Sequence, residues 1–284
     1  MNNAAIGVYD SGLGGLTAVR ELSKILPNED IIYFGDTGRV PYGNRSNETI
    51  KKYSKQAIRF LRTHNVKIIL VACGTVSSIA IEDLRIAFPD ISISGVVEAS
   101  CQKAVEIADS ANNNKIGVIA TAATISKDAY SKYIAKNNKN NNYNIISKAC
   151  PLFVSLVENG YVDKNNKIIR LVAEEYLAEL RQENLAALIL GCTHYPMIAE
   201  VIDEITNEKA GEKENRTVLV DSGYESAHEL KRELQKRDMA HEDNHKGKLE
   251  IYVSDEVVNF AKLASDFLGV DVSGNIKKID IDAE

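Results

Sequence analysis

Short apolar runs alternate with segments whose apolar residues recur at helical spacing along most of this 284-residue chain. Each run is bounded by small or turn-forming residues, which is typical of a buried strand in a parallel sheet. Such runs cover residues 6–9, 31–34, 66–72, 91–97, 116–120, 187–190, 217–221 and 249–253. Helical spacing covers residues 16–26, 48–64, 77–88, 100–111 and 256–268, with a further helix from about residue 226. The alternation predicts an α/β protein whose parallel sheets are covered by helices.

The strand pattern repeats in the middle of the chain. The opening strand and its first polar residue, 6–10, read IGVYD, and residues 116–120 read IGVIA. A second pair of similar runs, 68–75 and 187–194, has a comparable separation, and each run contains a cysteine after its apolar stretch. These repeats predict two similar parallel-sheet domains of the flavodoxin- or Rossmann-like kind.

Several polar segments separate or follow these elements. Residues 112–114 predict a loop, the Asn- and Lys-rich residues 137–142 predict a surface turn, and residues 207–216 predict a linker. The charged segment 231–248 predicts a solvated helix plus loop rather than a binding arm. The tail from residue 271 is expected at the periphery of its domain.

Composition narrows the function classes. The net charge of −6 argues against a general nucleic-acid surface. No apolar stretch approaches the roughly 20 residues of a membrane span. No signal-peptide pattern precedes the first strand, so we expect a cytoplasmic protein with reduced cysteines. The four cysteines form no CxxC pair, which argues against a zinc ribbon or a thioredoxin motif.

Cys73 and Cys192 are the leading candidates for chemistry. Each follows an apolar strand and precedes a predicted helix, and open α/β sheets bind ligands at that edge. A helix N-terminus also lowers the pKa of a thiol, which favours the reactive thiolate. The alternative for a single cysteine is a small core residue, and we assign Cys101 and Cys150 to packing. Two matched thiols predict one sulfur on each side of a single substrate.

Other candidates lie in loops after strands. The glycine-rich loop 10–17 offers N–H groups for an anion, but it lacks the spacing of a dinucleotide site or a P-loop. Asp10 is either functional or a helix cap, and the loop 35–43 is either a binding loop or an ordinary turn. His194 is a base, an acid or a structural residue, and Cys-x-His alone does not indicate a metal site. After the strand 116–120, a group of hydroxyl side chains either binds a carboxylate or caps a helix: Thr121, Thr124 and Ser126.

Taken together, these motifs resemble bacterial glutamate racemases, of the cofactor-independent aspartate/glutamate racemase superfamily. The matching segments run from the first strand to residue 222. They are DSGLGG (10–15), YFGDT (33–37) with Arg39, PYG (41–43), VAC (71–73), CPLFV (150–154) with Glu158, GCTHYP (191–196) and DS (221–222). Each motif is modest by itself, and their order along the chain makes the resemblance specific.

The resemblance implies an isomerase that interconverts L- and D-glutamate without cofactor or metal and supplies D-glutamate for peptidoglycan synthesis. It also implies two α/β domains that face each other across a cleft. The first domain would combine residues 1–97 with the returning segment 213–284, and the second would cover residues 98–212. A homodimer is the assembly that the family suggests, and no nucleic-acid or membrane partner is expected.

The resemblance also implies roles for individual residues. Cys73, with Asp10 beside it, would deprotonate D-glutamate. Cys192, with Glu158 and His194 beside it, would deprotonate L-glutamate. The small-molecule substrate would be bound by residues of both domains, which are Asp10, Ser11, Pro41, Tyr42, Gly43, Gly74, Thr75, Thr121, Thr124, Thr193 and His194.

One position departs from the family pattern. Family members usually have Cys-Asn-Thr where this chain has Cys73-Gly74-Thr75. Gly74 keeps only its backbone N–H, so one side-chain hydrogen bond worth about 0.5–1.5 kcal/mol is expected to be lost. Because both thiols remain, we expect weakened or altered substrate binding rather than loss of the chemistry. Gly74 leaves open a racemase for aspartate or another acidic amino acid. A separate alternative is a binding or regulatory paralogue without activity.

Overall fold

The computed structural model describes residues 3–138, 142–208, 216–241, 244–255 and 260–282. The chain forms two compact units, each with its own sheet. The first unit combines residues 1–96 with residues 223–284, and the second covers residues 97–222. Every strand pair in both sheets is parallel, which confirms the predicted α/β class with two parallel-sheet domains.

The first unit contains a six-stranded sheet in the order β10-β9-β2-β1-β3-β4. Its strands are β1 (Ala5–Asp10), β2 (Ile31–Gly35), β3 (Val66–Val71), β4 (Ser92–Gly95), β9 (Leu249–Val253) and β10 (Ile276–Lys278). Val8 of β1 lies beside Tyr33 on one side and Leu70 on the other. Because β1 is covered by neighbours on both edges and by helices on both faces, all of its residues are buried.

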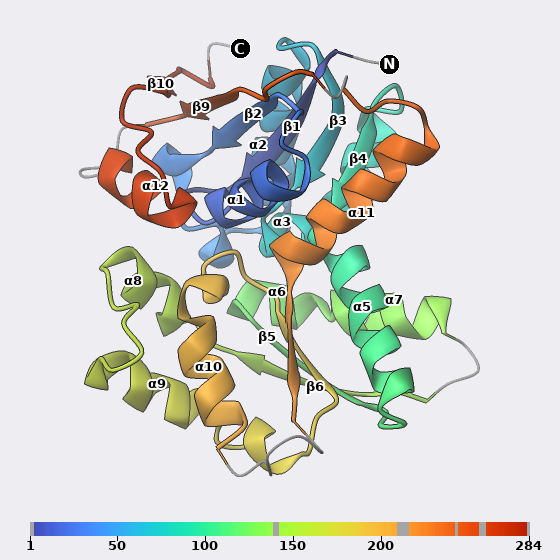
Figure 1. Ribbon diagram of the computed structural model, residues 1–284, viewed down its shortest axis with the longest axis vertical. Coiled ribbons are helices and arrows are strands. Elements are labelled where there is room, and N and C mark those ends of the chain that lie inside the picture. The colour runs from blue at the N-terminus through green and yellow to red at the C-terminus, as the bar shows by residue number, and fades with distance from the viewer. Residues whose placement is uncertain (1–2, 139–141, 209–215, 242–243, 256–259, 283–284) are drawn as a thin grey trace. The chain divides into compact units, whose positions relative to one another are not determined.

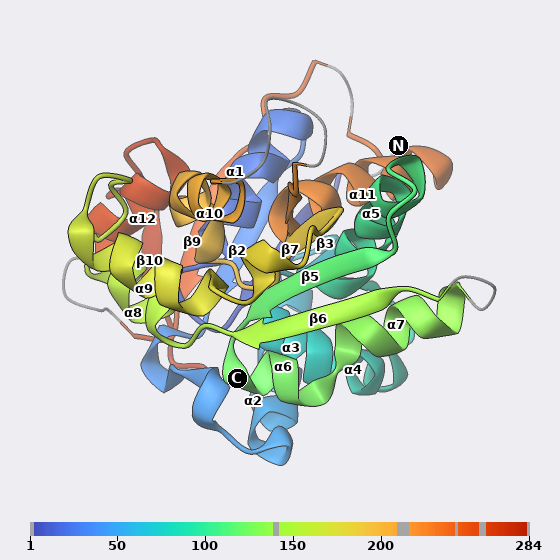
Figure 2. The same cartoon turned by 90° about the horizontal axis from the view of Figure 1, so that it is seen from below.

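Helices cover both faces of this sheet. They are α1 (Leu16–Ile25), α2 (Asn47–Arg62), α3 (Gly74–Ile79), α4 (Ile81–Ala87), α11 (Ser222–Lys236) and α12 (Phe260–Leu268), with the short 3₁₀ turns η1 (Thr37–Arg39) and η2 (Tyr42–Asn44). Figures 1 and 2 show α1 and α12 on one face and α2 and α4 on the other. Ser46 caps α2 by accepting the Thr49 N–H at 3.2 Å. Phe60 of α2 packs against Phe34 of β2 with ring centroids 5.2 Å apart, so an aromatic core anchors α2 to the sheet.

The second unit contains a four-stranded sheet in the order β6-β5-β7-β8. Its strands are β5 (Lys115–Ala120), β6 (Asn144–Ala149), β7 (Ala187–Leu190) and β8 (Val218–Asp221). Its helices are α5 (Val96–Ser110), α6 (Ala122–Lys127), α7 (Ala129–Asn137), α8 (Leu152–Glu158), α9 (Lys167–Leu177) and α10 (Ala199–Thr206), with the turns η3 (Leu180–Gln182) and η4 (Tyr195–Ile198). Figure 1 shows α5 and α7 on one side of the sheet and α9 and α10 on the other.

The two sheets share a strand order around their centres. In the first, the chain passes from β1 to β2 on one side and then crosses to β3 on the other. In the second, it passes from β5 to β6 and then crosses to β7. Open α/β sheets bind ligands at such a reversal, outside the carboxyl ends of the two strands that flank it. Those ends lead into Ser11 and Cys73 in the first unit, and into Thr121 and Cys192 in the second.

The structure corrects three boundaries. Residues 213–284 were assigned to the first domain, but β8 pairs with β7, so the chain leaves the second unit only after Ser222. The single helix predicted over residues 77–88 is two helices, α3 and α4, which meet at Ala80. The strand predicted over residues 91–97 ends at Gly95, because α5 already begins at Val96. The domain boundary was misplaced because the polar segment 207–216 looks like a linker, although the strand after it still belongs to the second sheet.

The tail is less peripheral than predicted. Its residues 276–278 form β10, which extends the first sheet by one edge strand beside β9. The surface turn at 137–142, the linker at 207–216 and the start of the predicted helix at 256 extend into residues outside the described part of the chain. None of the described helices combines the length and the apolar character that a bilayer span requires.

Candidate active site

The first half-site surrounds the end of β1. Asp10 is buried, and its Oδ1 accepts the backbone N–H of Gly12 at 2.9 Å. A side chain at Gly15 would place its Cβ only 2.4 Å from the Cβ of Asp10, so the loop needs glycine there to pass close to the carboxylate. The glycine-rich loop is therefore a tight support for Asp10 at the carboxyl edge of the sheet.

Cys73 lies at the neighbouring strand end. It is the N-cap residue of α3, and its side chain is buried. The Cys73 thiol donates a hydrogen bond to Oγ of Ser11 at 3.3 Å. Beneath them, the Tyr33 hydroxyl donates to the Gly12 carbonyl at 2.6 Å. Burial, and then the charges of Asp10 and Cys73, raise the pKa of Tyr33, so this phenol stays protonated as a fixed donor.

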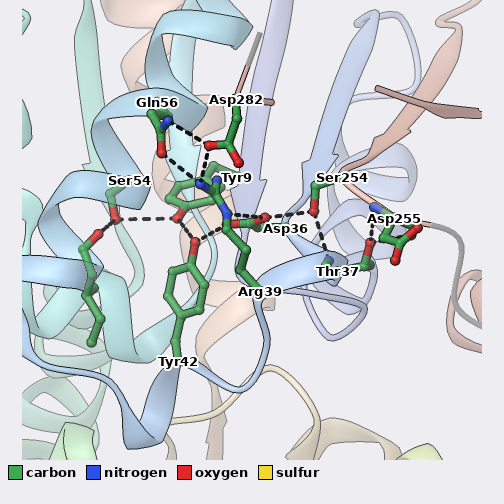
Figure 3. A network of polar contacts seen from close by, with 12 residues as sticks. Tyr9, Asp36, Thr37, Arg39, Tyr42, Ser54, Gln56, Ser254, Asp255 and Asp282 are labelled. Atoms are coloured by element: carbon green, nitrogen blue, oxygen red, sulfur yellow. Dashed lines mark hydrogen bonds and ion pairs between the residues drawn. The ribbon is translucent and has the colours of Figure 1, made fainter. Parts of the chain in front are cut away.

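The loop after β2 is held by a buried carboxylate, as Figure 3 shows. Asp36 is fully buried, and its Oδ2 accepts Nε of Arg39 at 2.8 Å. Oδ2 also accepts the Tyr42 hydroxyl in a short hydrogen bond. The Tyr9 hydroxyl donates to Tyr42 at 3.1 Å. Because its hydroxyl is engaged inward, Tyr42 would reach a substrate through its backbone rather than through its hydroxyl.

The same network ties this loop to the end of the chain. Oγ of Ser254, which follows β9, donates to Oδ1 of Asp36 at 2.7 Å. Arg39 also donates to Gln56 at 2.7 Å, and Gln56 donates to Asp282 at 3.1 Å. The sequence motif contains Asp36 and Arg39, but nothing in the sequence connects them with Ser254 or Asp282. Those contacts arise only because β9 lies beside β2 in the folded sheet.

The second half-site contains a row of three polar side chains. Cys192 follows β7, and its Sγ lies 3.8 Å from Nδ1 of His194. Nε2 of His194 lies 2.9 Å from Oε1 of Glu158 at the end of α8. Cys192 and His194 are buried, whereas the Glu158 side chain is 42% exposed. A thiol, an imidazole and a carboxylate in this order can share and transfer a proton.

The surroundings of His194 favour its charged form. Burial alone would lower the pKa of His194, but the contacts with Cys192 and Glu158 outweigh it and raise the pKa to about 10. His194 is therefore an imidazolium near neutral pH. Its positive charge lies beside the sulfur of Cys192.

Neighbouring groups support this row. The Tyr195 hydroxyl donates to the Cys150 carbonyl at 2.8 Å, and its ring meets Phe153 edge-on at 5.3 Å. Ser222 donates to the Leu190 carbonyl at 2.8 Å, which braces the last residue of β7. These contacts fix the backbone on both sides of Cys192 and His194. The sequence motifs include Tyr195 and Ser222 without indicating these bracing roles.

The remaining predicted residues are placed as follows. Thr121 is the N-cap residue of α6, as the capping interpretation predicts. Its Oγ1 lies 2.9 Å from Oγ1 of Thr124. Ser126 is exposed and donates to the Ala123 carbonyl. Others lie in the loops and helix starts beside the two thiols or Tyr42: Pro41, Gly43, Gly74, Thr75 and Thr193.

The other two cysteines differ from this pair. Cys101 and Cys150 are fully buried, and neither has an imidazole partner among the described contacts. Burial raises the pKa of Cys150 to about 12 and raises that of Cys101 as well. Both thiols stay protonated, which agrees with the packing roles assigned from the sequence.

Known proteins are similar to this chain in sequence and in fold. The family model described as Asp/Glu/Hydantoin racemase matches residues 15–219. The glutamate racemase of Geobacter metallireducens is 38% identical over 280 residues, covering 99% of this chain and 98% of that protein. The crystal structure of the Francisella tularensis glutamate racemase in complex with D-glutamate superposes with a TM-score of 0.88 at 37% identity, covering 100% of both chains.

The chain belongs to the Asp/Glu/hydantoin racemase family. A further relative, the glutamate racemase of Thermoanaerobacter pseudethanolicus, is 39% identical over 282 residues, with 99% of each chain covered. Both candidate half-sites lie within or directly beside the matched segment, since Asp10 precedes it by a few residues and Cys73, Glu158 and Cys192 lie inside it. Family membership therefore covers both sheets and their switch points.

Proposed function

We propose that this chain is a glutamate racemase that interconverts L- and D-glutamate by proton transfer at Cα between Cys73 and Cys192. The observation that carries the proposal is the matched placement of two buried thiols. Cys73 follows β3 and Cys192 follows β7, and each of these strands is the one to which the chain crosses over in its own sheet. Each thiol also has a polar partner, which is Ser11 for Cys73 and His194 for Cys192. The full-length similarity to glutamate racemases supports this choice of substrate.

Two thiols suit the reaction. Racemisation removes the Cα proton from one face and returns a proton to the other face. With a base on each face, neither base has to cross the substrate. Cys192 as thiolate would accept the proton of L-glutamate while Cys73 as thiol supplies one to the opposite face, and the roles reverse for D-glutamate. This arrangement requires both sulfurs to reach opposite faces of one bound substrate.

The supporting groups set the protonation states. His194, paired with Glu158, would exchange a proton with Cys192, and Asp10 would assist Cys73. General acid–base catalysis of this kind contributes about 10²–10⁴-fold. The rest of the rate enhancement would come from polar donors and from the exclusion of water around the carbanion. Thr75, Thr121, Thr124 and Thr193 are the hydroxyl donors that we assign to the substrate carboxylates.

The first test is optical rotation of purified protein with L-glutamate and, separately, with L-aspartate, without added cofactor. We expect loss of rotation with L-glutamate after dialysis against a chelator and without pyridoxal phosphate. Rotation change with L-aspartate alone would establish the aspartate alternative. No change with either amino acid would establish the non-catalytic paralogue, and a requirement for pyridoxal phosphate or metal would contradict a cofactor-free reaction.

Variants then assign the thiols. Cys73→Ala and Cys192→Ala should each abolish racemisation and leave the circular dichroism spectrum of the fold unchanged. Cys101→Ala is the control, because Cys101 is a buried thiol within α5 that contacts the Tyr130 carbonyl. Full activity of either catalytic variant would eliminate the two-base scheme.

We also propose that the protein acts in the cytoplasm as a homodimer and that its D-glutamate enters peptidoglycan. The family suggests the dimer, and the residues themselves do not specify it. Light scattering after size exclusion tests it, and the mass of a single chain at working concentration would refute it. Depletion of the protein should make growth depend on added D-glutamate.

A further inference from the structure

A cluster of metal-ligating side chains lies at the opposite end of the first sheet from Cys73. Asp30 directly precedes β2, whereas Cys73 follows the carboxyl end of β3, and parallel strands keep these ends apart. Asp30, His241 and His245 each offer one ligand atom, and these atoms all lie within 4.8 Å of one another. Within the part of the chain that the structure describes, this is the one such group of three or more.

Two contacts hold the three side chains close to one another. Nε2 of His245 lies 2.8 Å from Oδ1 of Asp30. The imidazole rings of His241 and His245 stack with centroids 3.8 Å apart at an interplanar angle of 20°. All three residues are partly buried, which limits the side-chain freedom that binding would remove.

Contacts that do not use the three ligand side chains hold the chain near His241 and Gly247. The His241 N–H donates to Oε1 of Glu29 at 2.7 Å, and Glu29 forms a buried ion pair with Lys67. The Gly247 N–H donates to the Pro27 carbonyl at 3.0 Å. A Cβ at Gly247 would lie 2.2 Å from the Glu29 carbonyl oxygen, so the chain passes here as closely as glycine allows. The chain at His241 and at Gly247 is therefore anchored beside the residues that precede β2.

We propose that Asp30, His241 and His245 form a binding site for a divalent transition metal, with Zn²⁺ as the best match. Two imidazoles and one carboxylate suit Zn²⁺, and water would complete a tetrahedron. Tetrahedral zinc with bonds of about 2.0–2.1 Å needs donor atoms about 3.3 Å apart. To reach this spacing, the His245 nitrogen and the Asp30 oxygen, now 2.8 Å apart, would separate slightly. One of the two stacked imidazole rings would also turn, so that a nitrogen of each ring faces the ion. Nε2 of His245 would release its proton to solvent and exchange its contact with Asp30 for a bond to the metal.

The proposed metal would join the loop between α11 and β9 to the start of β2. An ion that binds the folded chain but not the unfolded chain stabilises the fold by RT ln(1 + c/Kd), where c is the concentration of the free ion. The role is separate from racemisation, since the cluster lies at the other end of the strands. The sequence alone does not reveal it, because Asp30 is remote from the His-x₃-His segment.

The test is calorimetric titration of tag-free, chelator-treated protein with zinc sulfate. Thiols also bind zinc, so the Cys73→Ser/Cys192→Ser double variant is titrated in parallel. We expect one equivalent of Zn²⁺ to bind both proteins and to raise their melting temperatures. Absence of binding to the parent chain, or its loss in the double variant, would overturn the proposal.

Single variants locate the site. His241→Ala should weaken Zn²⁺ binding at least about tenfold, because loss of even an outer partner of a metal ligand costs about 10–100-fold. Its fold should persist, since the contact with Glu29 uses the backbone. Asp30→Asn should behave likewise, and circular dichroism of both variants without metal verifies folding. His228→Ala, which changes a histidine of α11 outside the cluster, should bind as the parent does. Unchanged affinity in His241→Ala and Asp30→Asn would overturn the assignment.

Discussion

Replacing Glu158 with Gln removes the negative charge beside His194 and preserves the size of the side chain. In the parent, Oε1 of Glu158 lies 2.9 Å from Nε2 of His194. A hydrogen bond between charged groups is worth about 1.5–3 kcal/mol. The Glu158 side chain is 42% exposed, so solvent screening reduces this to about 1–2 kcal/mol. The predicted loss in kcat/KM is therefore about 5–30-fold.

The pH profile should change as well. The proposed mechanism needs one cysteine as thiolate and the other as thiol. On the Cys192 side, the proton is held by Cys192 together with His194. Glu158→Gln removes a negative charge that helps this pair to keep its proton. The alkaline limb of the pH profile of kcat/KM should therefore move to lower pH. Circular dichroism of the amino acid measures kcat/KM across the pH range. The two enantiomers should lose kcat/KM equally, because the equilibrium constant of a racemisation is one.

The matched control is Glu183→Gln, which changes a glutamate of similar exposure, 41%, paired with Lys115 in the same unit. This variant should retain the parent profile. If Glu158→Gln kept both the rate and the alkaline limb of the parent, the assigned role of the His194–Glu158 pair would be wrong.

The same pair predicts a stability effect. The folded-state pKa of His194, about 10, lies above its ordinary value of 6.5. Its proton therefore stabilises the fold fully below pH 6.5, and this contribution is lost as pH rises through about 10. The melting temperature of Glu158→Gln should fall furthest below the parent near pH 6.5, and the difference should shrink toward pH 10. A constant difference across that range would contradict the raised pKa.

Three further variants test the substrate loop and the strand ends. Tyr42→Phe removes a hydroxyl bonded to the buried carboxylate Asp36. Thermal melts should show a decrease of about 1.5–3 kcal/mol in the free energy of unfolding, and KM should rise. A melt like that of the parent would contradict the role of this network. Gly35→Ala would place its Cβ 2.4 Å from the Gly12 carbonyl oxygen and should cost about 1–3 kcal/mol in urea unfolding, whereas Gly274→Ala, which meets nothing within 4 Å, should stay within about 0.5 kcal/mol. Gly74→Asn should lower KM for glutamate by about 2–12-fold by adding one hydrogen bond, and an unchanged KM would show that this contact is replaced by another group.

The sequence predicted the parallel sheets because their strands are continuous apolar runs that end in polar or small residues. The same pattern located Cys73 and Cys192, since both follow such runs. It misplaced the second domain's end at residue 212, because the strand order that puts β8 beside β7 is a property of the folded sheet.

Long-range polar contacts were the part that the sequence could not supply. Asp36 lies in the loop 35–43 that follows a predicted strand, but its bond with Ser254 depends on β2 lying beside β9. Asp30 and His245 are likewise joined only through that neighbourhood. Local patterns encode which residues follow a strand, whereas the pairing of strands decides which of them meet.

Hydrogen exchange at Cα in D₂O tests the two-base mechanism most directly. Cys73→Ala should exchange the Cα hydrogen of L-glutamate for deuterium through Cys192, without forming D-glutamate and without exchanging D-glutamate. Cys192→Ala should do the reverse. Nuclear magnetic resonance of each enantiomer measures the exchange. Exchange of both enantiomers by one variant, or racemisation by either variant at the parent rate, would contradict the assignment of one cysteine to each face.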